Sequence, residues 1–263
     1  MRSVLIIAGS DSSAGAGIQA DLKTCAALGV YGTTAITALT AQNTMGVTAI
    51  HEAPAEFVAA QIDAIVEDIR PDAVKTGMLA NAAIIKVAAA KIKEHALPFV
   101  VVDPVMVARS GDRLLREDAV TALRELLLPL ADVVTPNIPE AEDLTGHPVR
   151  TDEEVRAAAR EIQSLGARNA VIKGGHRGGE AAIDVLFDGR AFHEFAAPRI
   201  KTRSTHGTGC TFASAVAAFL ARQENVPDAV QHAKDYLTEA LRRAEPIGHG
   251  HGPVNHFWAF RRD

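Results

Sequence analysis

Short apolar runs alternate with amphipathic stretches along most of the chain, and this alternation predicts strands followed by helices. Apolar, β-prone runs predict strands at residues 4–8, 33–39, 47–51, 73–75, 99–102, 132–134 and 170–172. Apolar residues at helical spacing predict helices at 18–28, 58–69, 84–95, 118–128, 151–165, 208–222 and 227–243. Thr151 and Glu154 have the spacing of a capping box, which places the start of one of these helices.

The rhythm breaks once, at residues 183–195. Two apolar runs flank Asp188-Gly189 there, which predicts a β-hairpin with a type I′ turn. The repeated strand–helix units predict a mostly parallel sheet covered by helices on both faces, with antiparallel strands added late. A closed (β/α)₈ barrel has the same alternation, but the hairpin and the two consecutive C-terminal helices argue against it. Because no repeat, low-complexity tract or Pro-rich linker interrupts the pattern, we expect one domain over residues 1–263.

Composition narrows the class of protein. The chain has 263 residues, of which 48% are hydrophobic, so most of it has the material for a folded core. A net charge of −5 argues against a nucleic-acid binder, which usually shows a basic excess. The apolar run at residues 4–8 is too short for a signal peptide or a membrane span. Cys25 and Cys210 have no CxxC or zinc spacing, and we expect a soluble, cytoplasmic protein in a reducing compartment.

The glycines fall into two clusters. In the first, Gly15, Gly17 and Ala20 match the G-x-G-x-x-A pattern of dinucleotide-binding proteins. However, residues 10–14 separate this pattern from its strand, and the acidic residue expected about 20 positions later is missing. The alternative is a flexible turn into a helix, which lets a ligand approach the backbone.

The second cluster, residues 205–211 (THGTGCT), opens a predicted helix. Converging backbone N–H groups and the helix N-terminus together form an anion site suited to phosphate. It is not a P-loop, because no Lys-Ser/Thr pair follows the glycines. Cys210 stands in the first helical turn, where the helix dipole is expected to lower the pKa of its thiol. Cys25 lies on an apolar stripe and is expected to be a buried, unreactive residue.

Charged residues follow several predicted strands. Asp103 and Glu140 stand just past two of them, where carboxylates suit a magnesium ion held mainly through water, although either could instead cap a helix. Lys234 shares the apolar face of the last helix, so it either extends to solvent or reaches a phosphate site. His249, His251 and His256 invite a metal hypothesis, but their glycine spacers give no rigid geometry.

Eight motifs in order resemble the hydroxymethylpyrimidine/phosphomethylpyrimidine kinase family of thiamine biosynthesis, within the ribokinase-like superfamily. They cover residues 8–24, 38–44, 75–79, 101–106, 135–146, 173–176, 204–215 and 248–257. One departure is Ala14, where the family more often has glycine; alanine tolerates a positive φ poorly, so the loop could differ there.

The resemblance implies a three-layer α/β/α sandwich and a homodimer. It also implies ATP-dependent phosphorylation of 4-amino-5-hydroxymethyl-2-methylpyrimidine, first to the monophosphate and then to the diphosphate. By motif position, Gln42 would bind the aminopyrimidine in a pocket lined by Gly9, Asp21, Met78 and Val105. Cys210 would be the base, with an anion hole formed by the backbone of Gly207 and Gly209. ATP would lie against Lys173, Lys234, Thr208 and Asn137, and Mg²⁺ would be held by Asp103 and Glu140.

Two alternatives remain open. A pyridoxal kinase of the same branch acts on a similar substrate, since pyridoxine also carries a hydroxymethyl group on a flat nitrogen heterocycle. A non-catalytic small-molecule sensor could use the same fold, although Cys210, Lys173, Glu140 and the intact glycine loop argue against it.

Overall fold

A computed structural model of the chain describes residues 1–106, 117–176 and 179–260. Its strands form one sheet in the order β3-β2-β1-β4-β5-β6-β7-β8-β9, which is open and not a closed barrel. β1, β2 and β4 to β7 run parallel, whereas β3, β8 and β9 are antiparallel to their neighbours. The strands are β1 (Ser3–Asp11), β2 (Tyr31–Asn43), β3 (Gly46–Glu52), β4 (Ala73–Thr76), β5 (Val100–Val102), β6 (Val133–Val134), β7 (Ala170–Ile172), β8 (Ala181–Phe187) and β9 (Phe192–Pro198).

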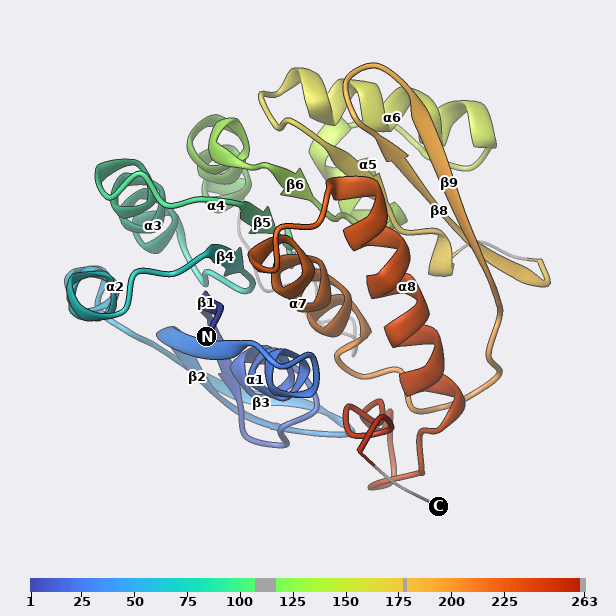
Figure 1. Cartoon of the computed structure of the whole chain (residues 1–263), viewed down its shortest axis with the longest axis horizontal. Helices are drawn as coiled ribbons and strands as arrows, with labels where there is room; N and C mark the ends of the chain where they lie inside the picture. The colour runs from blue at the N-terminus through green and yellow to red at the C-terminus, as the bar shows by residue number, and fades with distance from the viewer. Residues whose placement is uncertain (107–116, 177–178, 261–263) are drawn as a thin grey trace.

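Helices cover both faces of this sheet (Figure 1). They are α1 (Gly17–Ala27), α2 (Ala55–Asp68), α3 (Ala82–Glu94), α4 (Glu117–Ala122), α5 (Ile138–Thr145), α6 (Asp152–Ser164), α7 (Thr208–Ala221) and α8 (Val226–Arg242). The predicted α/β/α sandwich with a late antiparallel hairpin is therefore confirmed.

Two apolar layers hold the sandwich together, one on each side of the sheet. Side chains alternate along β1, so Val4 and Ile6 join the layer under α1, α7 and α8. Leu5 and Ile7 join the opposite layer, under α2 to α6. Strands buried on both faces need apolar residues at successive positions, which explains why the central strands read as continuous apolar runs.

Several predicted elements differ from the structure in their bounds. β1 runs on to Asp11 because Ser10 and Asp11 pair with Leu39 and Thr40 of β2, so the loop predicted at 9–17 is shorter. β2 also extends, to Asn43, and forms an early antiparallel pair with β3. The helix predicted at 118–128 is α-helical only to residue 122 and continues as π- and 3₁₀-helical turns to residue 130.

The predicted hairpin is confirmed, but its type I′ turn is wrong. Such a turn needs positive φ at two successive residues, whereas Gly189 alone has one among loop residues 188–191. The Asp188 carboxylate instead accepts hydrogen bonds from the backbone N–H groups of Arg190 and Ala191, and this sets the loop.

The sequence periodicity also missed α5. This helix is eight residues long, too short for a clear apolar stripe. Its start is marked by a capping box between Asn137 and Glu140, the same device that Thr151 and Glu154 form at the predicted start of α6. In the described part of the chain, no helix is long and apolar enough to span a membrane.

Candidate active site

A cavity of about 660 Å³ lies beyond the carboxyl ends of the parallel strands and faces the start of α7. This is where open α/β sheets bind ligands. The structure brings together thirteen of the predicted site residues along its lining: Gly9, Gln42, Met78, Asp103, Val105, Asn137, Glu140, Lys173, Gly207, Thr208, Gly209, Cys210 and Lys234.

The N-terminus of α7 forms one end of the cavity. Gly207, its N-cap, has φ of 77°, and a Cβ there would lie 1.9 Å from the carbonyl oxygen of Gly15. Glycine is therefore required both by the conformation and by the close backbone approach. The first-turn N–H groups of Thr208 and Gly209 have no partner within the helix, and with the helix dipole they offer a binding site for an anion.

Lys173 and Asp103 meet beside this helix end. The Lys173 ammonium lies 3.1 Å from Oδ1 of Asp103, and both side chains are largely buried. Each also lies close to the position that a Cβ of Gly209 would occupy, at 3.4 Å for Nζ and 3.5 Å for Asp103 Oδ2. Oδ2 of Asp103 is buried and has no hydrogen-bond partner among the described residues. Such an oxygen is suited to a cation or a bound hydroxyl.

Glu140 is both a helix cap and a cavity residue. Its Oε2 accepts a hydrogen bond from the backbone N–H of Asn137 at 2.8 Å, so the capping alternative is correct for this residue. Burial raises the pKa of Glu140 to about 7; the Lys173 charge opposes this shift and the Asp103 charge adds to it. A positive ion placed near Asp103 would favour the ionised form of Glu140.

Lys234 is buried on α8, as its place on the apolar face predicts. Its ammonium does not extend to solvent but lies 2.8 Å from Oδ2 of Asp184. The other oxygen of Asp184 accepts the backbone N–H of Gly174, which follows Lys173. Asp184 thereby fixes Lys234 and the chain around Lys173 on the same side of the cavity.

The prediction of a lowered pKa for Cys210 is wrong. Burial, together with the nearby carboxylates of Asp21 and Asp103, raises the pKa of the thiol to about 12. The charge of Lys75 and a hydrogen bond from the Gly17 backbone oppose this rise without cancelling it. The helix dipole is therefore not the dominant influence, and the thiol is protonated at neutral pH.

Cys25, as predicted, is fully buried, and burial likewise raises its pKa to about 12.

Asp21 does not line the cavity, which corrects its predicted place in the substrate pocket. Its carboxylate is fully buried beneath the cavity, 2.9 Å from the ammonium of Lys75, and accepts a hydrogen bond from Ser214 Oγ at 2.7 Å. Lys75 is the residue that reaches the lining. Burial lowers the pKa of Lys75, but the adjoining Asp21 charge raises it overall, so the ammonium stays charged.

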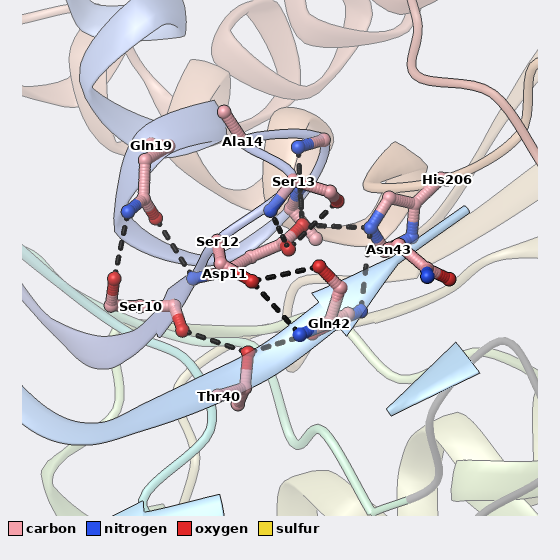
Figure 2. A network of polar contacts seen from close by, with 12 residues as sticks. Ser10, Asp11, Ser12, Ser13, Ala14, Gln19, Thr40, Gln42, Asn43 and His206 are labelled. Atoms are coloured by element: carbon pink, nitrogen blue, oxygen red, sulfur yellow. Dashed lines mark hydrogen bonds and ion pairs between the residues drawn. The ribbon is translucent and has the colours of Figure 1, made fainter. Parts of the chain in front are cut away.

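Asp11 organises the loop after β1 (Figure 2). Its carboxylate accepts hydrogen bonds from the backbone N–H groups of Ser13, Gly15 and Ala16 and from the Ser13 hydroxyl. Oδ2 also lies 2.8 Å from Nε2 of His206. Burial raises the pKa of Asp11, but these hydrogen bonds outweigh it and lower the pKa to about 2.

Ala14, within this loop, has φ of 62°, so the loop keeps the glycine-like conformation despite the alanine.

Sequence reasoning assigned no role to Asp11, Lys75, His206 or Asp184. For Lys75 the signal was a charged residue inside a short buried strand, which is rare without a partner. His206 stands within the second glycine cluster, and Asp11 follows the apolar run at residues 4–8 after two small residues. Their contact joins positions 195 residues apart, and no local pattern reveals such a pairing.

Comparison with known proteins confirms the family that the motifs indicate. Residues 11–255 match the family described as phosphomethylpyrimidine kinase. A hydroxymethylpyrimidine/phosphomethylpyrimidine kinase of Bacillus subtilis is 50% identical over 98% of this chain and 96% of its own. The thiamine biosynthesis bifunctional protein of Geobacter sulfurreducens is 56% identical over 98% of this chain, which spans 52% of that protein's length. The crystal structure of a Bacillus subtilis pyridoxal kinase with ADP superimposes with a TM-score of 0.93, at 42% identity and full coverage of both chains.

Replacing Lys75 with methionine is expected to destabilise the fold by about 3–5 kcal/mol, because it leaves the Asp21 carboxylate buried and unpaired. Adding Asp21→Asn removes that charge and keeps an acceptor for Ser214, so the double variant is expected to recover most of the loss. Urea unfolding of the three proteins measures the effect. A single variant as stable as the parent would contradict the buried ion pair.

Asp11 is expected to make stability depend on pH in the acid range. Its pKa is about 2 when folded and 3.8 ordinarily, so it contributes about 2 kcal/mol above pH 4. This contribution is lost as the pH falls from about 5 to 2, since protonation then favours the unfolded chain. In Asp11→Asn the slope over this range should be shallower, as measured by urea unfolding at several pH values. An unchanged slope would show that other carboxylates account for it.

Proposed function

Because the chain belongs to the phosphomethylpyrimidine kinase family, we propose that it transfers the γ-phosphoryl group of ATP to 4-amino-5-hydroxymethyl-2-methylpyrimidine, and then a second one to the resulting monophosphate. One observation carries this proposal: the N-terminal end of α7 shares a cavity with a buried lysine, the Gln42 amide and a carboxylate oxygen that has no partner among the residues described. These are the parts that phosphoryl transfer to a polar heterocycle needs.

The phosphate end of the site would be formed by the start of α7 and two lysines. The N–H groups of Thr208 and Gly209 face the developing charge, and Lys173 and Lys234 stand on the cavity lining with their positions already fixed by Asp103 and Asp184. Because these charges are held in place before the substrate arrives, little reorganisation is needed during transfer. Asn137 lies on the same side, where the nucleotide would bind.

Magnesium would be held by Asp103 and Glu140. The residues fit the ion, since Oδ2 of Asp103 is buried with no partner in the described part of the chain, and both side chains offer the oxygen ligands that Mg²⁺ prefers. When bound, Mg²⁺ neutralises phosphate charge in the transition state. The positive charge of Lys173 offsets the repulsion between the two carboxylates, and its ion pair holds Asp103 in place.

The other end of the cavity would take the pyrimidine. Gln42 carries a donor and an acceptor side by side, which complements the amino group and ring nitrogen of an aminopyrimidine. Gly9, Met78 and Val105 line the same region. A Cβ at Gly9 would lie 2.6 Å from Cε of Met78, so the small residue leaves room for the methionine against a flat ring.

Cys210 would face the substrate hydroxyl and accept its proton. Only its thiolate form can accept that proton, and with a pKa of about 12 this form is a small fraction of the enzyme at neutral pH, which grows as the pH rises. Phosphoryl transfer places small demands on a base, because positioning and charge stabilisation carry most of the catalysis.

Pyridoxal phosphorylation is a second candidate activity. It is favoured by the close superposition on a pyridoxal kinase at 42% identity. Both substrates present a hydroxymethyl group on a flat ring, so one cavity can orient either. We further propose a cytoplasmic homodimer, for which the family resemblance is the support.

An ATP-consumption assay coupled to product detection tests the proposed function. The purified chain with Mg²⁺, ATP and the hydroxymethylpyrimidine should form the monophosphate and then the diphosphate, with a higher kcat/KM than for pyridoxal. A higher value for pyridoxal would move the assignment to the second activity. No turnover of either substrate would favour a non-catalytic sensor.

Gln42→Leu is expected to raise KM for the pyrimidine by about 10–100-fold, because two hydrogen bonds to the ring are lost. KM for ATP should change little, since Gln42 is not among the residues proposed to bind the nucleotide. Steady-state kinetics with each substrate varied in turn measure both constants. An equal rise in both would refute the assignment of Gln42 to the pyrimidine.

Cys210→Ala is expected to lower kcat by about 10²–10⁴ while pyrimidine binding survives. In the parent enzyme the rate should rise with pH between 7 and 9, because the thiol pKa of about 12 keeps the thiolate fraction growing through this range. The variant should lose that rise. A near-normal kcat, or a flat parent profile, would remove Cys210 from the role of base.

A further inference from the structure

Three cavity residues, Asp11, His206 and Gln42, are joined by polar contacts at one ring nitrogen of His206 (Figure 2). Nε2 of His206 is 2.8 Å from Oδ2 of Asp11 and 3.4 Å from the side-chain nitrogen of Gln42. Asp11 and His206 are buried, at 2% and 6% exposed. Gln42 thus meets the cavity at the end of a buried polar chain.

The imidazole of His206 is fixed in place on several sides. A Cβ at Gly15 would lie 2.3 Å from Cδ2 of the ring, so the ring packs directly on that glycine. The backbone N–H of His206 donates to the carbonyl of Gly252 at 2.9 Å. The ring therefore has little freedom to turn away from Asp11 or from Gln42.

The hydrogen on Nε2 follows from the partner it faces. The Asp11 carboxylate accepts hydrogen bonds from three backbone N–H groups and one hydroxyl, so it is ionised and offers acceptors alone. Nε2 of His206, at 2.8 Å, must then carry a hydrogen and donate it to Asp11. A protonated ring nitrogen has no lone pair left to accept from an amide N–H.

This decides which atom of the Gln42 amide faces the histidine. With the nitrogen toward His206, two N–H groups would oppose each other at 3.4 Å; with the oxygen there, the amide shares the Nε2 hydrogen that points to Asp11, in a weaker three-centre contact. Thr40, which faces the other atom of the Gln42 amide, favours the same orientation. Its hydroxyl lies 3.0 Å from the Ser10 carbonyl, to which it can donate its one hydrogen, leaving lone pairs 3.1 Å from the amide. Those lone pairs favour the amide nitrogen.

We infer that Asp11 and His206 are positioning residues that fix the orientation of the Gln42 amide, with its oxygen toward His206, and that this orientation selects an aminopyrimidine over a hydroxypyridine. The inference rests on the proposed function, since it deepens the role given there to Gln42. The Gln42 oxygen then has one lone pair, and its nitrogen one hydrogen, left for the substrate.

The two substrate classes respond differently to a wrongly turned amide. The amino group of an aminopyrimidine only donates, and its ring nitrogen only accepts, so a reversed amide mismatches both contacts. The hydroxyl group of pyridoxine can donate or accept, so it tolerates either orientation. Loss of the Asp11–His206 constraint should therefore penalise the aminopyrimidine more than pyridoxine.

The test compares kcat/KM for the hydroxymethylpyrimidine and for pyridoxine in His206→Phe, which keeps a ring but has no N–H. The ratio of the two values should fall by about tenfold or more, with KM for ATP within about twofold of the parent. His206→Gln, which restores a donor toward Asp11 and Gln42, should recover much of the ratio. His232→Phe, on the outer side of α8, is the matched control and should leave it unchanged. An unchanged ratio in His206→Phe overturns the inference.

Two further measurements keep the test decisive if His206→Phe does not fold. Thr40→Val removes the partner on the other side of the amide, and it too should lower the ratio. Nitrogen-15 NMR of the unliganded parent reports which ring nitrogen of His206 carries hydrogen at neutral pH. Hydrogen on Nε2 is expected, and a bare Nε2 overturns the inference. The NMR result needs no substrate. If the pyrimidine is not turned over, the proposed function is refuted, and the NMR measurement still tests the inference about His206 separately.

Discussion

The carbonyl of Gly15 lies against the α-carbon of Gly207, and the geometry of the cavity depends on this backbone contact. It brings the loop after β1 to the first turn of α7, although the two segments are nearly 200 residues apart in the chain. Asp11 can then bond His206, and the Gly17 backbone can reach the Cys210 sulfur. A side chain at Gly207 would force the two backbones apart and separate these groups together. The α7 end of the cavity and the Gln42 end thus share one structural support.

Charge around the cavity is organised as three buried lysine–aspartate pairs. Lys75 pairs with Asp21, while Lys173 and Lys234 pair with the carboxylates described above. Burying such pairs costs stability that apolar residues would not cost. In return the ammonium groups are held rigidly before any phosphate binds, and an anion entering the cavity meets charges that need no rearrangement. Two of these carboxylates, Asp21 and Asp103, add to the burial that raises the pKa of the Cys210 thiol.

The architecture was largely predictable because it rests on local patterns. Doubly buried strands such as β1 require apolar runs, and amphipathic helices such as α6 require a 3.6-residue period with a cap. Prediction failed where local signals are weak or where pairing partners decide the bounds. β1 continues to Asp11 because β2 continues beside it, and α5 is too short to show a period.

Most of the candidate site was also predictable, since strand ends and helix starts can be read from the chain, and this led to Lys173, Asp103 and the Gly207–Cys210 turn. What the sequence by itself determined is the order of elements, the edge of the sheet where the site lies and the family. The tertiary structure alone decided that Asp21 lies beneath the cavity, that Cys210 is a thiol, and that His206 joins Asp11 to Gln42. The physical reason is that burial and long-range charge set pKa values and hydrogen-bond partners, and both depend on which distant segments the fold packs together.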